Sequence, residues 1–423
     1  MVKPLFKVRT PQEVKMLLKD HLNLKDIIQK NIEEVDIKTA LHRFLAEEIV
    51  APANLPGFNR STMDGYAIRA EDSFGATDNL PSYLKIIGEI KMGIKPEFKS
   101  SPGEAVKIST GGMLPEGVNA VMMLEYTEQI DNNTVEIRKS ISPWENVVRE
   151  DEDLKKGETI LRKGQRLRSQ DIGVLAGIGK TSIKIYKKPK IAIISTGNEI
   201  IPAEGEPRIG QIRDINSYTL GVCIEESGGL PVYKGIIKDE AILLEQEVKK
   251  IIEEDKIEAV IISGGSSVGI RDVTLEVLNR LGKPGVLIHG VSVKPGKPMI
   301  LAIADNRPIF GLPGHPVSAM IIFDLFVRPL ISWLQGGEFS NNYSKEIGAE
   351  LTSNIVSDSG REDYIRVFLY KKGKKYYAEP ILGKSGLIST MVRASGLIKI
   401  GLNIEGLEAV SYTHLTLPTK RIV

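Results

Sequence analysis

Apolar and polar positions follow their most regular pattern between residues 189 and 333. Continuous apolar runs of strand length lie at 190–196, 231–237 and 258–263, and segments with the length and apolar spacing of helices separate them. A strand that is apolar throughout has to be covered on both faces, so this rhythm predicts a parallel sheet with helices on each side. The segment ends with "RPIFGLPGHPVSAMIIFDLFVRPLI", which predicts a strand, a Pro/Gly turn and a strongly apolar helix.

The chain on either side of this segment has a different pattern. Near the start, "TPQEVKMLLKDHL" predicts a helix with Thr10 as its N-cap, and "KTALHRFLAEEI" predicts a second helix. Between residues 51 and 150, short β-type segments alternate with Gly, Pro and Asn-Asn turns, which predicts a small inserted β-rich domain. "GQRLRSQDIGVLAGIG" predicts a further helix, and "YIRVFLY" and "KYYAEPIL" predict a β-rich C-terminal domain.

At 423 residues the chain exceeds the usual size of a single hydrophobic core. We expect an α/β and β multidomain protein of four parts: a helical and linking part at 1–50 and 151–188, a small β-rich domain at 51–150, a three-layer α/β/α domain at 189–333 and a C-terminal β domain at 334–410. The Thr-rich, charge-poor segment 411–423 does not continue the preceding pattern. We interpret it as a cloning scar or a sequence-assembly error and expect it to lie outside the fold.

Composition excludes several classes of protein. Lysine and arginine number 56 against 54 acidic residues, a net charge of +2, so no overall field indicates a nucleic-acid or membrane partner. The single cysteine, Cys223, excludes an intrachain disulfide framework and fits a reducing compartment. The sequence shows no apolar run before a cleavage site and no stretch of about 18 uncharged apolar residues, so we expect a soluble cytoplasmic protein.

Three Gly-rich connections follow predicted strands: Ser195-Thr196-Gly197, Ser263-Gly264-Gly265-Ser266-Ser267 and Gly311-Leu312-Pro313-Gly314. In an open α/β sheet, ligands bind beyond the carboxyl ends of the strands, where helix N-termini offer N–H donors to anions. Glycine lets backbone donors approach a phosphate closely, and serine adds hydroxyl donors. The alternative is that these glycines only form tight turns. Three such loops in one sheet indicate a phosphorylated ligand.

Other motifs suit an oxyanion or a polar site. "VSVKPGKPM" fixes Lys294 and Lys297 on a stiff Pro-Gly turn, which suits an oxyanion, although an ordinary solvated turn is the alternative. The β-rich domain is predicted to contain two polar loops, "NRSTMDGYAIRAED" and "KISTGGMLPEG". The acidic run "REDEDLKKGE" favours a solvated face, and a metal site is the alternative.

Several chemistries find no motif in the sequence. The five histidines, His315 among them, show no paired spacing, which disfavours zinc. The sequence contains no G-x-S-x-G elbow, no Walker A motif and no CxxC pair, so hydrolase, classical NTPase and redox functions are disfavoured.

With these residues in order, the sequence resembles the molybdopterin molybdenumtransferases, the MoeA family that includes the gephyrin E domain. The resemblance rests on "NLPGFNRSTMDGYAIRAED", "KISTGGMLPEGVNAVMMLE", "IAIISTGNEI", "GIIKDE", "IISGGSSVG", "VKPGKP" and "GLPGHPVS", which occur in the order of that family. It implies a MogA-like molybdopterin-binding α/β/α domain, a β-barrel-like C-terminal domain and a homodimer. It also implies the reaction, in which molybdate is inserted into adenylylated molybdopterin and AMP and molybdenum cofactor are released with the help of Mg²⁺.

The resemblance assigns roles to individual residues. It implies catalytic roles for Asp64, Thr110, Glu199, Asp239, Lys294 and Lys297, with Asp64 and Thr110 acting across the subunit interface. It implies binding of the adenylylated molybdopterin and molybdate by Ser195, Thr196, Gly197, Ser263, Gly264, Gly265, Ser267, Pro313, Pro316, Ser318, Arg366 and Ser389. For the metal it implies Asp153, Asp239 and Asp272.

The sequence departs from the family pattern at three places. Asn59 stands where the family usually has Asp, and Ile270 stands in place of the first carboxylate after the Ser-Gly-Gly loop. Neither side chain can supply charge to Mg²⁺, which puts metal-assisted hydrolysis in doubt. Asp272 either caps the following helix or takes over the metal. His315 replaces the usual Asn in Gly-Asn-Pro, which would alter the rim of the pocket.

Two other functions remain open from the sequence. A molybdopterin adenylyltransferase resembles residues 189 to 333 alone, but it does not need the motifs of the β-rich domain. A non-catalytic molybdopterin-binding paralogue would explain Asn59 and Ile270. The sequence does not separate molybdate from tungstate, because both are tetrahedral oxyanions of similar size.

Overall fold

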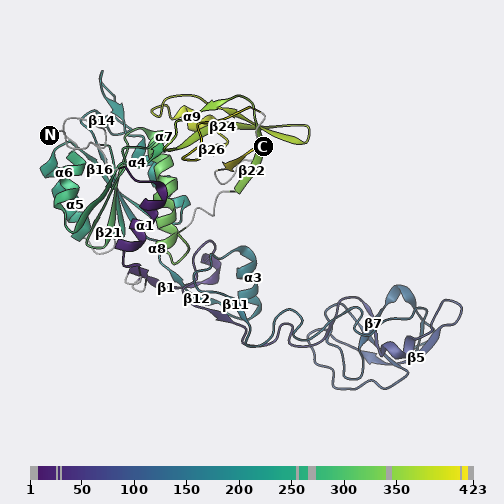
Figure 1. Ribbon diagram of the computed structural model, residues 1–423. Helices are drawn as coiled ribbons and strands as arrows, with labels where there is room; N and C mark the ends of the chain where they lie inside the picture. Colours follow the sequence, from purple (N-terminus) through teal and green to yellow (C-terminus); the bar gives the residue numbers. More distant parts are fainter. Residues whose placement is uncertain are drawn as a thin grey trace.

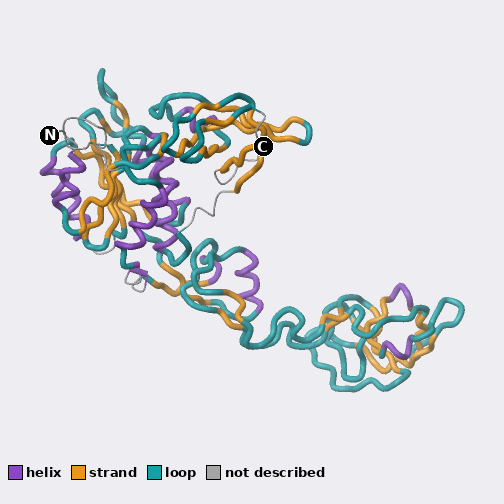
Figure 2. The backbone as a smooth tube through the Cα atoms, in the orientation of Figure 1, coloured by secondary structure: helices purple, strands orange, loops and turns teal. Residues whose placement is uncertain are grey.

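The structure of the protein is a computed structural model that describes residues 8–24, 27–28, 31–253, 257–264, 273–339, 345–409 and 412–417. The chain is elongated (Figure 1), with a large α/β unit at one end and a β-rich domain at the other. Between these two ends lies a smaller linking unit. Figure 2 shows that helices gather in the α/β unit and that long loops connect the parts.

The α/β unit is built on a six-stranded sheet in the order β16-β13-β17-β21-β20-β18. Its strands are β13 (Lys190–Thr196), β16 (Leu230–Ile237), β17 (Ala259–Ser263), β18 (Pro284–His289), β20 (Ile300–Ala304) and β21 (Arg307–Leu312). The first four in the sheet run parallel, and β20 and β18 are antiparallel to their neighbours. The predicted parallel sheet is therefore confirmed for its centre, while one edge turns back on itself as a hairpin.

Two apolar layers cover this sheet. The helices of the unit are α4 (Asn216–Glu226), α5 (Ala241–Glu253), α6 (Val273–Arg280), α7 (Pro316–Ile322) and α8 (Arg328–Leu334). One core contains Leu220 of α4 and Phe323 and Phe326 near α7, and a second core on separate strand residues contains Leu244 of α5 and Val277 of α6. The three-layer α/β/α arrangement predicted from the sequence is thus confirmed.

The apolar helix at the end of the unit is continuous from Pro316 to Leu334, with one π-helical segment η4 (Phe323–Val327) in its middle. Within the described part of the chain, it alone has the length and composition to cross a membrane. However, 78% of its most apolar window is buried inside the structure. Core helices of globular proteins pass the same test, and the packing of Phe323 and Phe326 explains the apolar composition here.

The N-terminal helix α1 (Pro11–His21) forms as predicted, with the Thr10 side chain accepting from the Glu13 N–H in a capping box. The second predicted helix, "KTALHRFLAEEI", is wrong. This segment contains only the end of a short 3₁₀ turn η1 (Ile37–Thr39). It then continues through a further turn and isolated β-bridges at Phe44 and Leu45 to β2 (Ile49–Val50). The backbone at His42 has φ 66°, and Ala46 N–H donates to Lys184 O, so pairing with distant chain replaces helical bonding.

The linking unit combines β-pairs with one helix. Strand β1 (Ile32–Asp36) pairs with β12 (Ser182–Tyr186), and β2 pairs with β11 (Thr159–Leu161). Helix α3 (Ser169–Gly177) lies where "GQRLRSQDIGVLAGIG" predicts it. Figure 1 places this unit between the α/β unit and the β-rich domain.

The β-rich domain contains a six-stranded sheet in the order β7-β4-β6-β5-β9-β8. The strands are β4 (Gly65–Ile68), β5 (Ser82–Glu89), β6 (Glu104–Ile108), β7 (Ala120–Met123), β8 (Thr127–Gln129) and β9 (Thr134–Ile137). A short pair, β3 (Arg60–Ser61) with β10 (Val147–Val148), joins the two ends of the domain. The many short strands and turns follow the predicted pattern.

The C-terminal domain closes on itself. Its sheet has the order β19-β24-β25-β22-β28-β26, and β24 also pairs with β26, so five strands form a barrel. The strands are β19 (Val293–Lys294), β22 (Lys345–Leu351), β24 (Glu362–Lys372), β25 (Lys375–Pro380), β26 (Gly396–Ile400) and β28 (Tyr412–Leu417). The implied barrel-like domain is confirmed.

One strand of this barrel corrects the sequence analysis. We expected 411–423 to lie outside the fold, but the backbone of Tyr412–Leu417 pairs with both β22 and β26. The segment "YTHLTL" is rich in residues that favour strands, and without it the barrel would have two unpaired edges. The pairing shows that these six residues complete the barrel.

Replacing Gly65 with alanine tests the packing of the β-rich domain. A Cβ at Gly65 would lie 1.8 Å from the carbonyl oxygen of Met122 on the neighbouring strand. We therefore expect Gly65→Ala to destabilise the domain by about 1–3 kcal/mol, measured by thermal melting and by faster limited proteolysis. Gly88→Ala in the same sheet is the matched control, because its nearest neighbour is Phe98 Cζ at 3.5 Å. Equal stability of the two variants would contradict this packing.

Candidate ligand site at the carboxyl edge of the α/β sheet

The described residues of the three Gly-rich loops lie side by side at the carboxyl ends of β13, β17 and β21, and the second loop is described only as far as Gly264. Gly264 N–H donates to Leu312 O at 3.1 Å. Gly264 has φ 110°, and a Cβ there would lie 2.0 Å from Thr196 O. A Cβ on Gly314 would in turn lie 3.7 Å from Gly264 Cα. Only glycine permits this close approach of β17 to β13, so the loops meet as predicted.

The hydroxyl groups at the end of β13 donate to two carboxylates. Ser195 Oγ donates to Asp214 Oδ2 at 2.7 Å, and both side chains are buried. Thr196 Oγ1 donates to Asp239 Oδ1, also at 2.7 Å. The predicted residues Ser195, Thr196 and Asp239 therefore share one edge of the sheet, where the half-buried Asp239 leaves its second oxygen for other partners.

Asp214 and Asn216 were missed by the sequence analysis. Asn216 Nδ2 donates to Ser263 Oγ at 2.7 Å and to Gly314 O at 2.8 Å, so it joins two of the loops. Its Oδ1 is buried and has no hydrogen-bond partner among the described residues. A usable signal was present, because Asp214 precedes the predicted helix and accepts from Ser217 N–H as a capping residue does.

The loop after β13 carries a further predicted residue, Glu199. A Cβ on Gly197 would lie 2.9 Å from Glu199 Oε2, so the exposed carboxylate of Glu199 stands over the Gly197 backbone. Asn198 Oδ1 accepts from Asp239 N–H at 3.3 Å. Glu199 and Asp239 thus lie on adjoining loops at the same edge.

The lysine turn lies against α7. A Cβ on Gly296, between Lys294 and Lys297, would lie 2.6 Å from Ile322 Cδ1 and 3.8 Å from Ser318 O. Helix α7 begins directly after the β21 loop, with Pro316 in its first turn and Ser318 buried. The first turns of α7 therefore connect the Gly-rich loops with the two predicted cations. Pro313 lies in the β21 loop itself.

The C-terminal barrel supplies Arg366 and Ser389. Buried Arg366 donates through Nη1 to Thr390 Oγ1 at 3.0 Å and through Nη2 to Gly383 O at 2.8 Å. Burial lowers the pKa of Arg366 below its usual range. Ser389 begins the short helix α9 (Ser389–Arg393), next to Thr390. The two predicted residues therefore lie together.

A loop of the barrel also contacts the start of α7. His315 Nδ1 lies 2.8 Å from Ser385 Oγ, and Val317 N–H donates to Ser385 O at 3.1 Å. His315 is one of the three departures from the family pattern named above. In this chain it forms part of the contact between the barrel and the α/β unit.

Asp64 and Thr110 form a pair in the β-rich domain. Asp64 Oδ1 accepts from Thr110 N–H at 2.7 Å and from Thr110 Oγ1 at 3.1 Å, and both residues are exposed. Figure 1 places the sheet of β5 and β7 at the opposite end of the chain from β21 and α7. One chain therefore does not bring this pair to Lys294.

The predicted metal ligands are not gathered within the described part of the chain, where no group of three His, Cys, Asp or Glu residues could hold an ion. Asp153 is exposed, and its N–H donates to Leu55 O at 3.1 Å, away from Asp239. The residues singled out from the sequence that lie outside the described part of the chain are Gly265, Ser267, Ile270 and Asp272. Asp239 remains a suitable single ligand, because Mg²⁺ in phosphate sites often takes one or two carboxylates and obtains the rest from phosphates and water.

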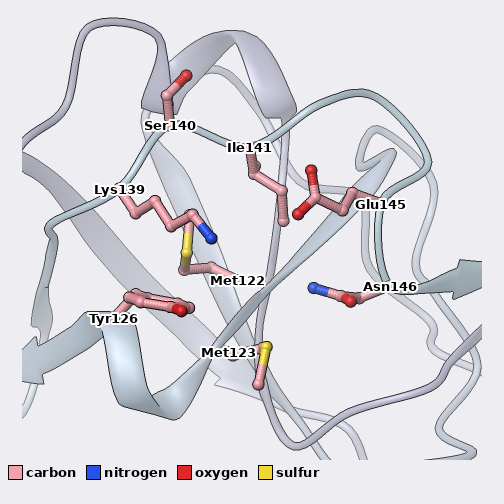
Figure 3. Close-up of a pocket in the computed structure, with 8 residues that line it drawn as sticks. All are labelled: Met122, Met123, Tyr126, Lys139, Ser140, Ile141, Glu145 and Asn146. Atoms are coloured by element: carbon pink, nitrogen blue, oxygen red, sulfur yellow. The ribbon is translucent and has the colours of Figure 1, made fainter.

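A small cavity in the β-rich domain is separate from these residues (Figure 3). At the edge of this cavity, Lys139 Nζ lies 4.2 Å from the centre of the Tyr126 ring. None of the predicted site residues lines it; the lining residues are Met122, Met123, Tyr126, Lys139, Ser140, Ile141, Glu145 and Asn146. The buried hydroxyl and amide groups gather instead at the sheet edge, which we take as the candidate site.

Models of protein families match the chain in three consecutive ranges. The MoeA N-terminal region, domains I and II, matches residues 10–179, and the MoeA C-terminal region, domain IV, matches 348–409. A model described as "Probable molybdopterin binding domain" matches 192–333, the range that holds the Gly-rich loops. The chain belongs to the MoeA family. The recognition made from the motifs is therefore confirmed.

Individual MoeA relatives are similar over nearly the whole chain. The molybdopterin molybdenumtransferase of Bacillus subtilis is 32% identical over 388 residues, covering 90% of this chain and 88% of the relative. The enzyme of the same name from Staphylococcus epidermidis is 32% identical over 410 residues, 95% of this chain and 94% of the relative. The crystal structure of the molybdopterin biosynthesis MoeA protein from Pyrococcus horikoshii matches with a TM-score of 0.83 and 31% identity, covering 97% of this chain and 100% of that one.

Gly264→Ala tests the close approach of the loops. A Cβ in the left-handed region, 2.0 Å from Thr196 O, has to displace β13 and with it the Thr196–Asp239 hydrogen bond. We expect binding of inorganic pyrophosphate, measured by calorimetry, to weaken about tenfold or more. Gly314→Ala is the control, since its Cβ would lie 3.7 Å from the nearest atom, Gly264 Cα. This variant should bind pyrophosphate as the wild type does. Unchanged binding by Gly264→Ala would remove this edge from consideration.

Proposed function

We propose that this chain inserts molybdate, or tungstate, into adenylylated molybdopterin, with hydrolysis of the adenylyl pyrophosphate bond and release of AMP and molybdenum cofactor. The observation that carries the proposal is the placement of the lysine turn beside Ser318 on α7, the helix that starts from the Gly-rich loops. A tetrahedral oxyanion and a pyrophosphate would then bind next to one another. The whole-length similarity to molybdopterin molybdenumtransferases supports the same reaction.

The groups present suit binding and orientation more than nucleophilic attack. Backbone N–H groups of the Gly-rich loops would hold the pyrophosphate, apart from that of Gly264, which donates to Leu312 O. Lys294, Lys297 and Arg366 would hold the oxyanion, whose charge matches theirs. Placing the two reactants in one cleft replaces an encounter in solution by a reaction within a complex, which lowers the entropic part of the barrier.

Metal assistance is a separate part of the proposal. Asp239 would contribute one carboxylate oxygen, and the pyrophosphate of the substrate would contribute others. When bound, Mg²⁺ would neutralise charge that develops on the phosphate oxygens. Asp239 itself is oriented by its bond from Thr196 Oγ1, so the β13 hydroxyl fixes the direction of the carboxylate.

We further propose a cytoplasmic homodimer in which each cleft uses two chains. Asp64 and Thr110 lie in the β-rich domain, far from Lys294 of the same chain (Figure 1). A second copy would bring its own Asp64–Thr110 pair opposite the α/β unit. Such a closed, two-fold arrangement gives two equivalent clefts per dimer.

An AMP-release assay tests the reaction. Purified full-length protein with adenylylated molybdopterin and Mg²⁺ should release AMP only when molybdate is added, and AMP is measured by chromatography. Molybdopterin with ATP should give no adenylylated product. An adenylylated product would instead favour an adenylyltransferase. Tight binding without cleavage at any Mg²⁺ concentration would favour a non-catalytic binding protein, and competition between molybdate and tungstate would show the preferred oxyanion.

Mixing two inactive variants tests the shared cleft. Asp64→Asn and Lys294→Met should each abolish most activity, because each removes one side of the cleft. After the two are unfolded and refolded together, half of the dimers would be mixed and would hold one intact cleft, so activity should return to about a quarter of wild type. Separately refolded variants are the control. Absence of recovery in mixtures that contain dimers would show that Asp64 does not act across the interface.

A further inference from the structure

A buried carboxylate lies behind one of the two site lysines. Asp363 on β24 is 0% exposed, and its Oδ2 lies 3.6 Å from Lys294 Nζ. Its Oδ1 accepts from Arg361 Nε at 2.9 Å. Oδ2 is buried without a hydrogen-bond partner among the described residues, so the ammonium of Lys294 is the cation that it faces.

The backbone sets this contact. Strand β19 pairs in parallel with β24, and the register places Lys294 directly against Asp363. Glu362 N–H also donates to Ser292 O at 2.8 Å, which holds the lysine turn on the barrel. The position of the carboxylate relative to the lysine therefore follows from strand pairing and does not depend on a flexible loop.

Physical considerations favour a role beyond packing. A fully buried carboxylate is costly unless it is paired, and Arg361 supplies one pairing partner. Lys294 has a side chain that is 53% exposed and that would otherwise sample many rotamers. An ion pair with an immobile carboxylate restricts the ammonium to one region, at a small cost in free energy because part of the lysine remains solvated.

We infer that Asp363 is the positioning residue that fixes Lys294 for the oxyanion. The inference rests on the proposed function, because it assumes that Lys294 contacts molybdate. It assigns a second task to the C-terminal barrel: strand β24 carries Arg366 and also holds the lysine that comes from the α/β unit. Sites are effective when the groups that touch the ligand are themselves held in place.

The neighbouring residue provides a matched control. Glu362 is also a buried acid on β24, but it accepts from Lys399 Nζ at 2.8 Å and from Tyr364 Oη at 2.8 Å. These partners do not include a residue of the site. Glu362→Gln thus removes a buried, paired carboxylate from the same strand without touching Lys294.

The test uses the full-length chain with substitutions Asp363→Asn, Asp363→Glu, Glu362→Gln and Lys294→Met. For each variant, the KM for molybdate and kcat of AMP release are measured with the melting temperature. We expect both Asp363 variants to raise the KM about tenfold, because the ammonium is displaced, with little change in kcat. Glu362→Gln should keep the wild-type KM, and Asp363→Asn added to Lys294→Met should cause no further loss.

Other outcomes would overturn the inference. A lower KM in Asp363→Asn with no change in Asp363→Glu would mean that the carboxylate only offsets positive charge. An equal rise in Glu362→Gln, or melting temperatures of both Asp363 variants lowered by more than about 5 °C, would mean that Asp363 serves the fold. If Lys294→Met leaves the KM unchanged while the wild type is active, the proposed oxyanion site itself is wrong, which separates the two failures.

Discussion

The candidate site depends on the close approach of Gly264, the residue directly after β17, to Thr196 at the end of β13. No side chain fits there, because a Cβ would lie 2.0 Å from the carbonyl oxygen. Asn216 then joins Ser263 to Gly314 through one amide group, so the three loops form a single surface. The glycine allows the contact and the amide maintains it. This arrangement supports the proposal that the loops present backbone donors to a phosphate.

The second constraint is the attachment of the barrel to the α/β unit. It has two separate parts: β19 pairs with β24, and the loop around Ser385 contacts His315 and Val317 at the start of α7. The lysine turn continues from β19 and lies against Ile322 of α7. Cations from two domains can therefore occupy fixed positions relative to the Gly-rich loops, which a flexible connection between the domains would not ensure.

The sequence predicted what depends on local pattern and missed what depends on distant partners. The pattern of apolar positions predicted the sheet and helices of the α/β unit, and the spacing of glycines and lysines predicted the loops of the candidate site. The prediction of a helix around His42 failed because the backbone there pairs with residues distant in the sequence, such as Lys184. The strand Tyr412–Leu417 was not predicted because its place in the barrel depends on the edges of β22 and β26, which the local sequence does not reveal. Asp363 was missed for the same reason, since only the register of β24 places it beside Lys294.

Asn59, a departure from the family pattern, keeps the local hydrogen bonds of its loop. Its Oδ1 accepts from Glu150 N–H at 2.8 Å, and its carbonyl oxygen accepts from Leu114 N–H. An aspartate could accept the same bond from Glu150, so this local structure does not require a charge. The neutral amide keeps the loop that leads to Asp64 in place. Any effect of Asn59 on the reaction must therefore come from the missing negative charge, as at a metal ion, and not from a rearranged loop.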